Sequence, residues 1–405
     1  MIMQDNEKKP ALRFKGFTDP WEQRKLGEIA VFSKGVGYSK NDLCEEGTPI
    51  ILYGRLYTKY ETCIFDVDTF VKEKAGSVYS KGGEVIVPAS GETAEDISIA
   101  SVVVKPGILL GGDLNIVSPT AEYDSAFLAL TISSGATHKY LSSLAQGKSV
   151  VHLHNADIQS VSAKFPTKRE QEKIHLLFGK IDTLITLHQR KYEKLVNIKK
   201  SMLDKMFPKN GASVPEIRFK GFTDPWEQRK VGDHLIPSKL PGHTGVDARK
   251  LTVKLWGKGV VEKTDSYGGS EHTQYYVRHA GQFMYGKLDF LHAAFGIVPA
   301  ELDNYESTLD SPAFDLSEIN GKFLVSRVCK EDFYLKYGTI ANGSRKAKRI
   351  HEDTFMDMPI LVPELEEQER VAALLEALDT LITLHQRKLE KLQNIKKSCL
   401  EKIFV

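Results

Sequence analysis

Apolar side chains, with one histidine among them, recur three or four residues apart in the middle of the chain. The positions are Ile181, Leu184, His188, Tyr192, Leu195, Ile198, Met202 and Met206. On an α-helix this spacing forms a single stripe. Thr167 with Glu170 three residues later is typical of a helix start, and Pro208 would end the helix. The pattern predicts a helix within 166–207, on the order of 60 Å long at ~1.5 Å per residue.

The striped segment occurs twice. Residues 181–207 return at 378–404 with six of 27 positions changed, which predicts a second long helix over 363–405. Two matched stripes bury most apolar surface when they pack on each other as a coiled coil. Because a whole domain separates the two helices, we expect the pair to be antiparallel. The alternative is that each helix packs only on its own domain.

A second repeat frames the same pattern, since RFKGFTDPWEQRK at 13–25 returns letter for letter at 218–230. The segments between the repeated pieces show no visible likeness to each other. The chain therefore divides into an N-terminal element, a variable domain, a long helix, a linker with the repeated element, a second variable domain and a second helix. The boundaries are 1–27, 28–165, 166–207, 208–232, 233–362 and 363–405.

The variable segments have the pattern of mixed α/β domains. Short runs predict strands at 84–87, 99–104, 115–117, 282–285 and 322–328, with glycine-rich and polar turns between strands. The predicted fold class is α+β. Two mixed α/β domains are separated by two long helices in an antiparallel coiled coil, with a pseudo-twofold internal duplication.

Composition narrows the class of protein. The net charge of the 405 residues is only +2, and 28–160 hold 10 Lys and Arg against 16 Asp and Glu. A protein that holds DNA alone usually shows a clear basic excess, so local patches or a partner must supply phosphate contacts. The chain shows no membrane-length apolar run and no secretory signal, and its four cysteines lack metal-site spacing. These features predict a cytoplasmic protein.

The repeated pieces resemble the specificity subunit of type I restriction-modification enzymes. The resemblance rests on the paired RFKGFTDPWEQRK elements, the paired DTLITLHQRK helices and two helix starts with a proline before Glu-Gln-Glu, at 170–172 and 367–369. It implies two target recognition domains, each reading one half of a split DNA site. It also implies an antiparallel coiled coil that sets the spacing and docks two adenine-N6 methyltransferase subunits, which restriction/translocase subunits then join. S-adenosylmethionine, ATP and Mg would bind those partners and not this chain.

The candidate DNA-binding residues are basic, hydroxyl and aromatic side chains in predicted loops, because such groups contact phosphates and base edges. In the first domain they are Lys34, Tyr38, Lys40, Tyr53, Arg55, Tyr57, Lys59, Ser90, Thr93, Lys148, Ser149 and His152. In the second domain they are Lys258, Lys287, Ser344, Arg345, Lys346, Lys348 and Arg349. The alternative interpretation is an ordinary solvated loop or a half-exposed strand.

Trp21 and Trp226 occupy the same place in the two copies of DPWEQRK. They are candidates for partner binding, since tryptophan is enriched at interface hot spots, or they could seal each domain against its helix. No metal site is predicted at His188 and His385. The adenine-methyltransferase tetrapeptide and a complete phosphate loop are missing, so no catalytic residue is predicted. Two rivals remain: a coiled-coil scaffold with protein-binding domains, and a stand-alone DNA-modifying enzyme.

Overall fold

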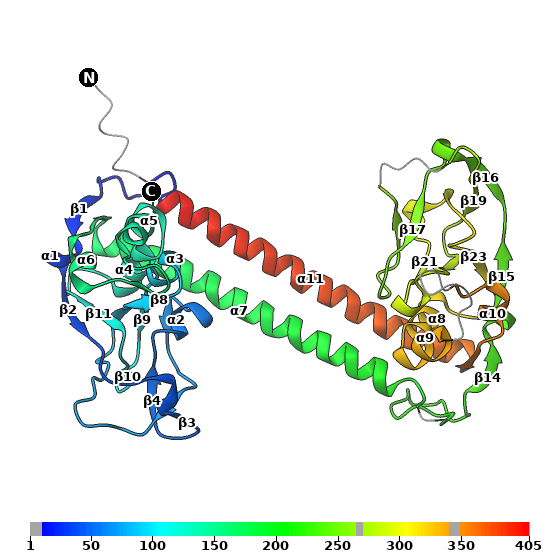
Figure 1. The fold of residues 1–405 in the computed structure, drawn as a ribbon, viewed down its shortest axis with the longest axis horizontal. Coiled ribbons are helices and arrows are strands. Elements are labelled where there is room, and N and C mark those ends of the chain that lie inside the picture. Colours follow the sequence, from blue (N-terminus) through cyan, green and yellow to red (C-terminus); the bar gives the residue numbers. More distant parts are fainter. Residues whose placement is uncertain (1–9, 210, 265–269, 340–348, 405) are drawn as a thin grey trace. The chain divides into compact units, whose positions relative to one another are not determined.

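A computed structural model describes residues 10–209, 211–264, 270–339 and 349–404 and divides the chain into two compact units (Figure 1). Unit 1 comprises Met1–Arg190 and Gln386–Val405, and unit 2 comprises Lys191–His385. Each unit contains one variable segment, the beginning of one long helix and the end of the other. Among the described residues, no helix is both long and apolar enough to cross a membrane.

Unit 1 is built around a five-stranded sheet. Its order is β2 (Ala30–Lys34), β11 (Leu114–Pro119), β7 (Glu84–Pro88), β9 (Ser101–Val103) and β5 (Cys63–Ile64), antiparallel except for the last pair. A second sheet has the order β10 (Leu109–Leu110), β4 (Thr48–Ile51), β6 (Phe70–Val71) and β3 (Leu43–Cys44). The central strand β7, with the sequence EVIVP, is buried along its whole length.

Short elements complete unit 1. Its helical segments are α1 (Leu26–Ile29), η2 (Lys40–Asp42), α2 (Arg55–Thr58), α3 (Ala94–Ile97), α4 (Ser125–Ile132), α5 (Gly135–Leu144) and α6 (Asn155–Ser160). Two small pairings join β1 (Glu22–Lys25) to β13 (Ser162–Phe165) and β8 (Ser90–Gly91) to β12 (Val151–His152).

Unit 2 has a different sheet arrangement. One sheet has the order β15 (Leu235–Ser238), β23 (Ala313–Leu316), β20 (Phe283–Tyr285) and β21 (Phe295–Ile297). Another has the order β16 (Pro241–Thr244), β19 (Gln274–Arg278) and β22 (Tyr305–Ser307). Two further two-stranded sheets join β17 (Leu251–Val253) to β18 (Val260–Glu262) and β14 (Glu227–Lys230) to β24 (Pro359–Val362). The helical segments are η3 (Val231–His234), η4 (Gly245–Asp247), η5 (Phe290–His292), η6 (Ala300–Leu302), α8 (Gly321–Val328), α9 (Glu331–Gly338) and α10 (Glu352–Met356).

The strand predicted at 322–328 is wrong, because these residues form α8. The side chain of Asn320 accepts a hydrogen bond from the Phe323 backbone N–H at 3.1 Å and so caps the helix. Phe323, Leu324 and Val328 then fall on one buried face. Burial of that face outweighs the preference of valine for strands.

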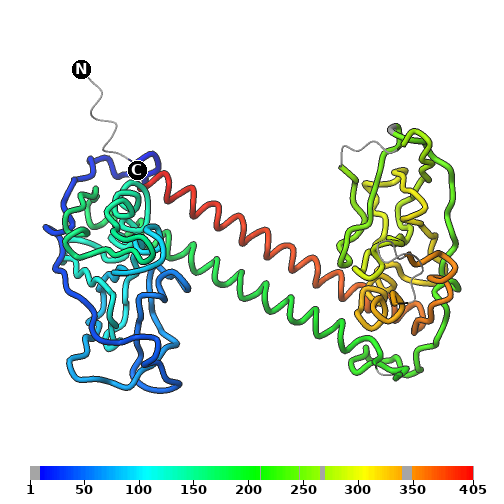
Figure 2. Tube along the Cα trace, in the orientation of Figure 1, coloured from blue at the N-terminus to red at the C-terminus, as the bar shows by residue number. Residues whose placement is uncertain are grey.

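The long helices are α7 (Lys168–Lys205) and α11 (Leu365–Ile403), shown in green and in orange to red in Figure 2. In unit 1, Lys396 of α11 is ion-paired with Asp182 of α7 at 2.6 Å. In unit 2, the equivalent residues Lys199 and Asp379 pair in the same way. The start of each helix thus lies against the end of the other, which confirms the antiparallel packing.

The apolar stripe differs from the prediction at Leu184 in the first copy, and at Leu381 and Ile395 in the second copy, because these three side chains are exposed. Ile185 is half-buried, whereas Leu184 and its equivalent Leu381 are exposed. Ile185 lies four residues after Ile181, which is the spacing that keeps a side chain on the contact face. The exposed leucines therefore lie outside the helix-to-helix contact.

The helix ends close the two domain cores. In unit 1, Phe404 packs on Phe127 and Phe178, with ring centroids 5.4 and 6.2 Å apart. In unit 2, the equivalent residue Phe207 packs on Trp226 and Phe323, at 5.8 and 5.4 Å. Each core is therefore completed by the last residues of a long helix that begins in the other unit.

A buried ion pair joins each repeated N-terminal element to a helix start. Arg13 donates two hydrogen bonds to the carboxylate of Glu170, at 2.7 and 2.8 Å, and Arg218 does the same to Glu367, at 2.8 and 2.7 Å. Both carboxylates are almost completely buried. This two-bond geometry is the strongest that arginine and carboxylate form, and it explains the shared Glu of the two Glu-Gln-Glu motifs.

The glutamine of each motif bonds the helix start to the variable domain. Gln171 accepts from the Asp124 backbone N–H at 2.9 Å and donates to the Pro166 carbonyl at 2.8 Å. Gln368 accepts from the Asn320 N–H and donates to the Pro363 carbonyl, both at 2.9 Å. The repeated frame therefore includes Asp124 and Asn320, which lie in segments that show no sequence likeness.

We expect Arg218→Met to lower the free energy of unfolding of unit 2 by about 3–5 kcal/mol, because it leaves the Glu367 carboxylate buried without its partner. Arg370→Met is the matched control, since its ion pair with Glu366, at 2.6 Å on the same helix, is exposed and should contribute less than about 1 kcal/mol. Urea unfolding followed by circular dichroism measures both. Equal losses in the two variants would contradict the structural role of the buried pair.

Candidate nucleic-acid interface

Two of the predicted DNA-binding segments of unit 1 meet in the structure. His152 pairs with Ser90 across β8 and β12, although 62 positions separate them in the sequence. The Gln146 and His152 backbones exchange two hydrogen bonds, at 3.0 and 2.7 Å, and so close the base of the loop between them. Lys148 and Ser149 are exposed in that loop, and His152 is exposed beside it.

The end of β2 lies against the same region. Asn115, opposite Lys34 in the sheet, donates to the Leu153 carbonyl at 2.8 Å, and Asn155 donates to the Ser33 carbonyl at 2.9 Å. Lys34 is exposed at this strand end. We define the unit 1 loop surface as Lys34, Lys148, Ser149 and His152. It is the part of the unit 1 prediction that the structure brings together with side chains facing solvent.

Three other DNA-binding candidates of unit 1 are buried or hydrogen-bonded within the domain. Ser90 is buried, and the Thr93 hydroxyl accepts from the Asp96 N–H at 3.1 Å and thereby caps α3. Tyr38 is buried, and its hydroxyl accepts from the Lys74 N–H at 2.7 Å and bonds Ser77 at 2.6 Å. Lys40, near it in η2, is exposed.

The two cations of the run from Tyr53 to Lys59 are paired with acidic residues that follow the run in the sequence. It forms α2 and not the strand of the alternative interpretation. Arg55 is nearly buried and pairs with Glu61 at 2.6 Å and Asp68 at 2.9 Å, so its guanidinium is not available to phosphate. Lys59 hydrogen-bonds Asp68 at 2.8 Å and lowers the pKa of that carboxyl.

The two tyrosines of the run lie beside Arg55 and Lys59. Tyr53 and Tyr57 are half-buried, with ring centroids 6.2 Å apart. Burial raises the pKa of Tyr57.

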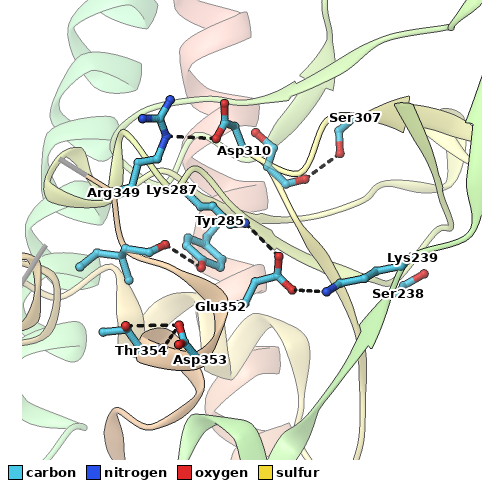
Figure 3. A network of polar contacts seen from close by, with 12 residues as sticks. Ser238, Lys239, Tyr285, Lys287, Ser307, Asp310, Arg349, Glu352, Asp353 and Thr354 are labelled. Carbon is cyan, nitrogen blue, oxygen red and sulfur yellow. Dashed lines mark hydrogen bonds and ion pairs between the residues drawn. The ribbon is translucent and has the colours of Figure 1, made fainter. Parts of the chain in front are cut away.

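Lys287 of unit 2 is also ion-paired within its own domain, as Figure 3 shows. Its ammonium lies 2.9 Å from Glu352, which Lys239 approaches at 3.2 Å. Burial acts to raise the pKa of Glu352, but the two ammonium groups outweigh it and hold the pKa below the ordinary value. Lys287 therefore fixes α10 to β20.

Of the basic cluster at 343–349, only the last residue lies within the described part of the chain. Ser344, Arg345, Lys346 and Lys348 lie outside the described residues. Arg349 is half-exposed and pairs with Asp310 at 3.2 Å (Figure 3). Next to it, the Tyr285 hydroxyl donates to the Ile350 carbonyl at 2.9 Å, so the chain leaves the cluster at a fixed place. Lys258 is exposed in the turn between β17 and β18.

Trp21 and Trp226 are only 5% and 3% exposed. Trp21 packs on Phe127 at 5.7 Å and Trp226 on Phe323 at 5.5 Å. Their burial favours the interpretation that each ring seals its domain, because a partner could reach only a small part of either ring.

Arg278 is a residue that the sequence did not single out. It is completely buried in β19, where its guanidinium donates to the Ser307 hydroxyl and the Ser238 carbonyl, both at 2.8 Å. Burial lowers the pKa of Arg278 to about 10. It joins the three-stranded sheet to β15, and only the packed structure reveals this role. The described residues contain no cluster of three or more His, Cys, Asp or Glu side chains placed to hold a metal.

Comparisons with known proteins agree on one family. Residues 18–197 match the type I restriction modification DNA specificity domain. The chain is 21% identical over 413 residues to the type I restriction enzyme MjaVIII specificity subunit of Methanocaldococcus jannaschii, covering 94% of this chain and 91% of that protein. Its fold is similar to that of the S subunit of a type I restriction-modification system from M. genitalium, with a TM-score of 0.62, 12% identity and coverage of 98% and 99% of the two chains.

We expect Lys148→Ala to weaken DNA binding and to reduce the slope of log affinity against log salt by about 1, as the loss of one phosphate contact requires. Lys59→Ala is the control, because that lysine is exposed but ion-paired with Asp68 at 2.8 Å. Fluorescence anisotropy over a salt series measures both variants. An unchanged slope for Lys148→Ala would remove this lysine from the interface.

Proposed function

We propose that this chain, which belongs to the family of type I restriction-modification specificity subunits, recognises a DNA site in two separate halves. Each variable domain reads one half, and the long helices set the unread gap between the halves. As a specificity subunit the chain recognises DNA and is not itself the catalyst. Methyl transfer with S-adenosylmethionine, and cleavage with ATP and Mg, belong to partner subunits that act with it in the cytoplasm.

One observation carries this proposal: the same bonds frame two different domains. Arg13 with Glu170 and Arg218 with Glu367 make equivalent two-bond pairs. Between these fixed points, unit 1 holds sheets of five and four strands, whereas unit 2 holds sheets of four and three strands. Two different variable domains between near-identical repeated elements support two independent DNA-recognition domains better than they support one shared active site.

The exposed leucines of the helices support docking of two methyltransferase subunits. Leu184 and Leu187 in unit 1, and their equivalents Leu381 and Leu384 in unit 2, are each exposed at between 42% and 45%. They lie outside the helix-to-helix contact, so helix pairing does not require leucine there. Both copies of the sequence TLITL nevertheless have leucine at these positions. Each unit thus offers the same apolar patch, which suits one copy of an identical partner.

Replacing residues 28–165 with the matching segment of another family member should change only one half of the methylated motif. Sequencing that maps N6-methyladenine in cells expressing the chain with its methyltransferase subunit measures the outcome. The control gives residues 181–207 the sequence of 378–404, which makes six changes in the frame and should leave the motif as it was. A motif unchanged by the domain exchange would favour the scaffold alternative. Methyl transfer by the purified chain alone would favour the enzyme alternative.

Replacing Leu184 and Leu187 with glutamate should remove one of two methyltransferase subunits from the purified complex, because charges in a buried interface are costly. The same change at Leu381 and Leu384 as well should remove both. Native mass spectrometry gives the stoichiometry. The matched control is Leu176→Glu, since Leu176 is 55% exposed on the same helix but lies outside the repeat. Full assembly with all four leucines replaced would place the docking surface elsewhere.

A further inference from the structure

Trp256 differs from the other two tryptophans in its exposure. Its side chain is 56% exposed, and it lies in the turn that joins β17 to β18. A large aromatic ring facing solvent loses the stabilisation that burial would give it. The sequence of the turn, KLWGKG at 254–259, contains two lysines and no acidic residue, and both lysines are exposed.

The backbone holds this ring in a fixed position. Trp256 has a φ of +62°, which residues with a side chain rarely adopt. Its N–H donates to the His292 carbonyl at 2.7 Å, and the next N–H donates to the Ala293 carbonyl at 2.8 Å. The indole also meets the His292 ring edge-on at 5.5 Å. The turn is thus attached to η5, and strained conformations that are held in this way concentrate at functional sites.

The turn is hydrogen-bonded to the connection from β20 to β21, which contains Lys287 and η5. In unit 1 the connection from β7 to β9, two neighbouring strands of the five-stranded sheet, contains Ser90, which pairs with His152. On its other side, η5 contacts the end of α9, where a Cβ added at Gly338 would lie 2.3 Å from Leu291. The basic cluster at 343–349 follows that helix in the sequence.

We propose that Trp256 inserts its ring against the bases of the second half-site, with Lys254 and Lys258 on the flanking phosphates. This inference rests on the proposed function and names a residue of the second reading surface. An exposed ring between two cations suits DNA, because bases stack on aromatic rings and phosphates attract lysine. A protein partner that covered the turn would have to desolvate both ammonium groups.

The test uses the complex of the full chain with its methyltransferase subunit and a labelled duplex carrying the motif that the wild-type complex methylates. Trp256→Ala should weaken binding about 10- to 100-fold, and Trp256→Phe should stay within about threefold, because phenylalanine also stacks. The salt slope should not change in Trp256→Ala. It should fall by about 2 in the double variant Lys254→Gln with Lys258→Gln. Leu255→Ala, at an exposed neighbour in the same turn, is the control and should bind normally.

Trp256→Gly separates stacking from folding, since glycine adopts a positive φ readily and should keep the turn. It should lose affinity as Trp256→Ala does while the urea midpoint is kept. Normal binding by Trp256→Ala, or equal losses in the Phe and Ala variants, would overturn the inference. So would loss of the methyltransferase subunit from Trp256→Ala complexes, which would show that the ring contacts protein. A failed domain exchange would instead overturn the proposed function.

Discussion

The two-bond pairing of a buried glutamate with an arginine from the repeated element is the constraint on which each unit depends. A carboxylate buried at a helix start is costly unless a cation reaches it, so Glu170 requires Arg13 and Glu367 requires Arg218. The pair joins the segment that enters a variable domain to the helix that leaves it. Pairing of β1 with β13 and of β14 with β24 fastens the same two points through the backbone.

Because both ends of each variable domain are fixed, the sequences and sheets between those ends can differ from one domain to the other. The glutamines at 171 and 368 bond only to backbone groups of the variable domain, through the N–H of Asp124 and Asn320. A hydrogen bond to a backbone N–H does not require a particular side chain at that position. The same frame therefore carries two domains with different sheets.

Charge in the sequence did not show which cations remain without an acidic partner in the fold. Arg55 and Lys287 looked available, yet Arg55 pairs with Asp68 and Lys287 with Glu352, which is 65 positions away. Folding brings such partners together, and a sequence shows the cation without the carboxylate that will neutralise it. Trp256 shows the opposite case, since the sequence does not reveal whether a tryptophan is buried, and the fold leaves this ring exposed.

The sequence by itself determined the duplication and the two long helices, because helical periodicity and exact repeats can be read without coordinates. It predicted the antiparallel pairing, which the ion pairs between the two helices confirm. It also carried the family resemblance, through the repeated motifs. Only the tertiary structure decided that α8 is a helix, that Phe404 and Phe207 close the two cores, and that Ser90 lies against His152. Each of these depends on contacts between distant residues, where burial and hydrogen bonding outweigh local preference.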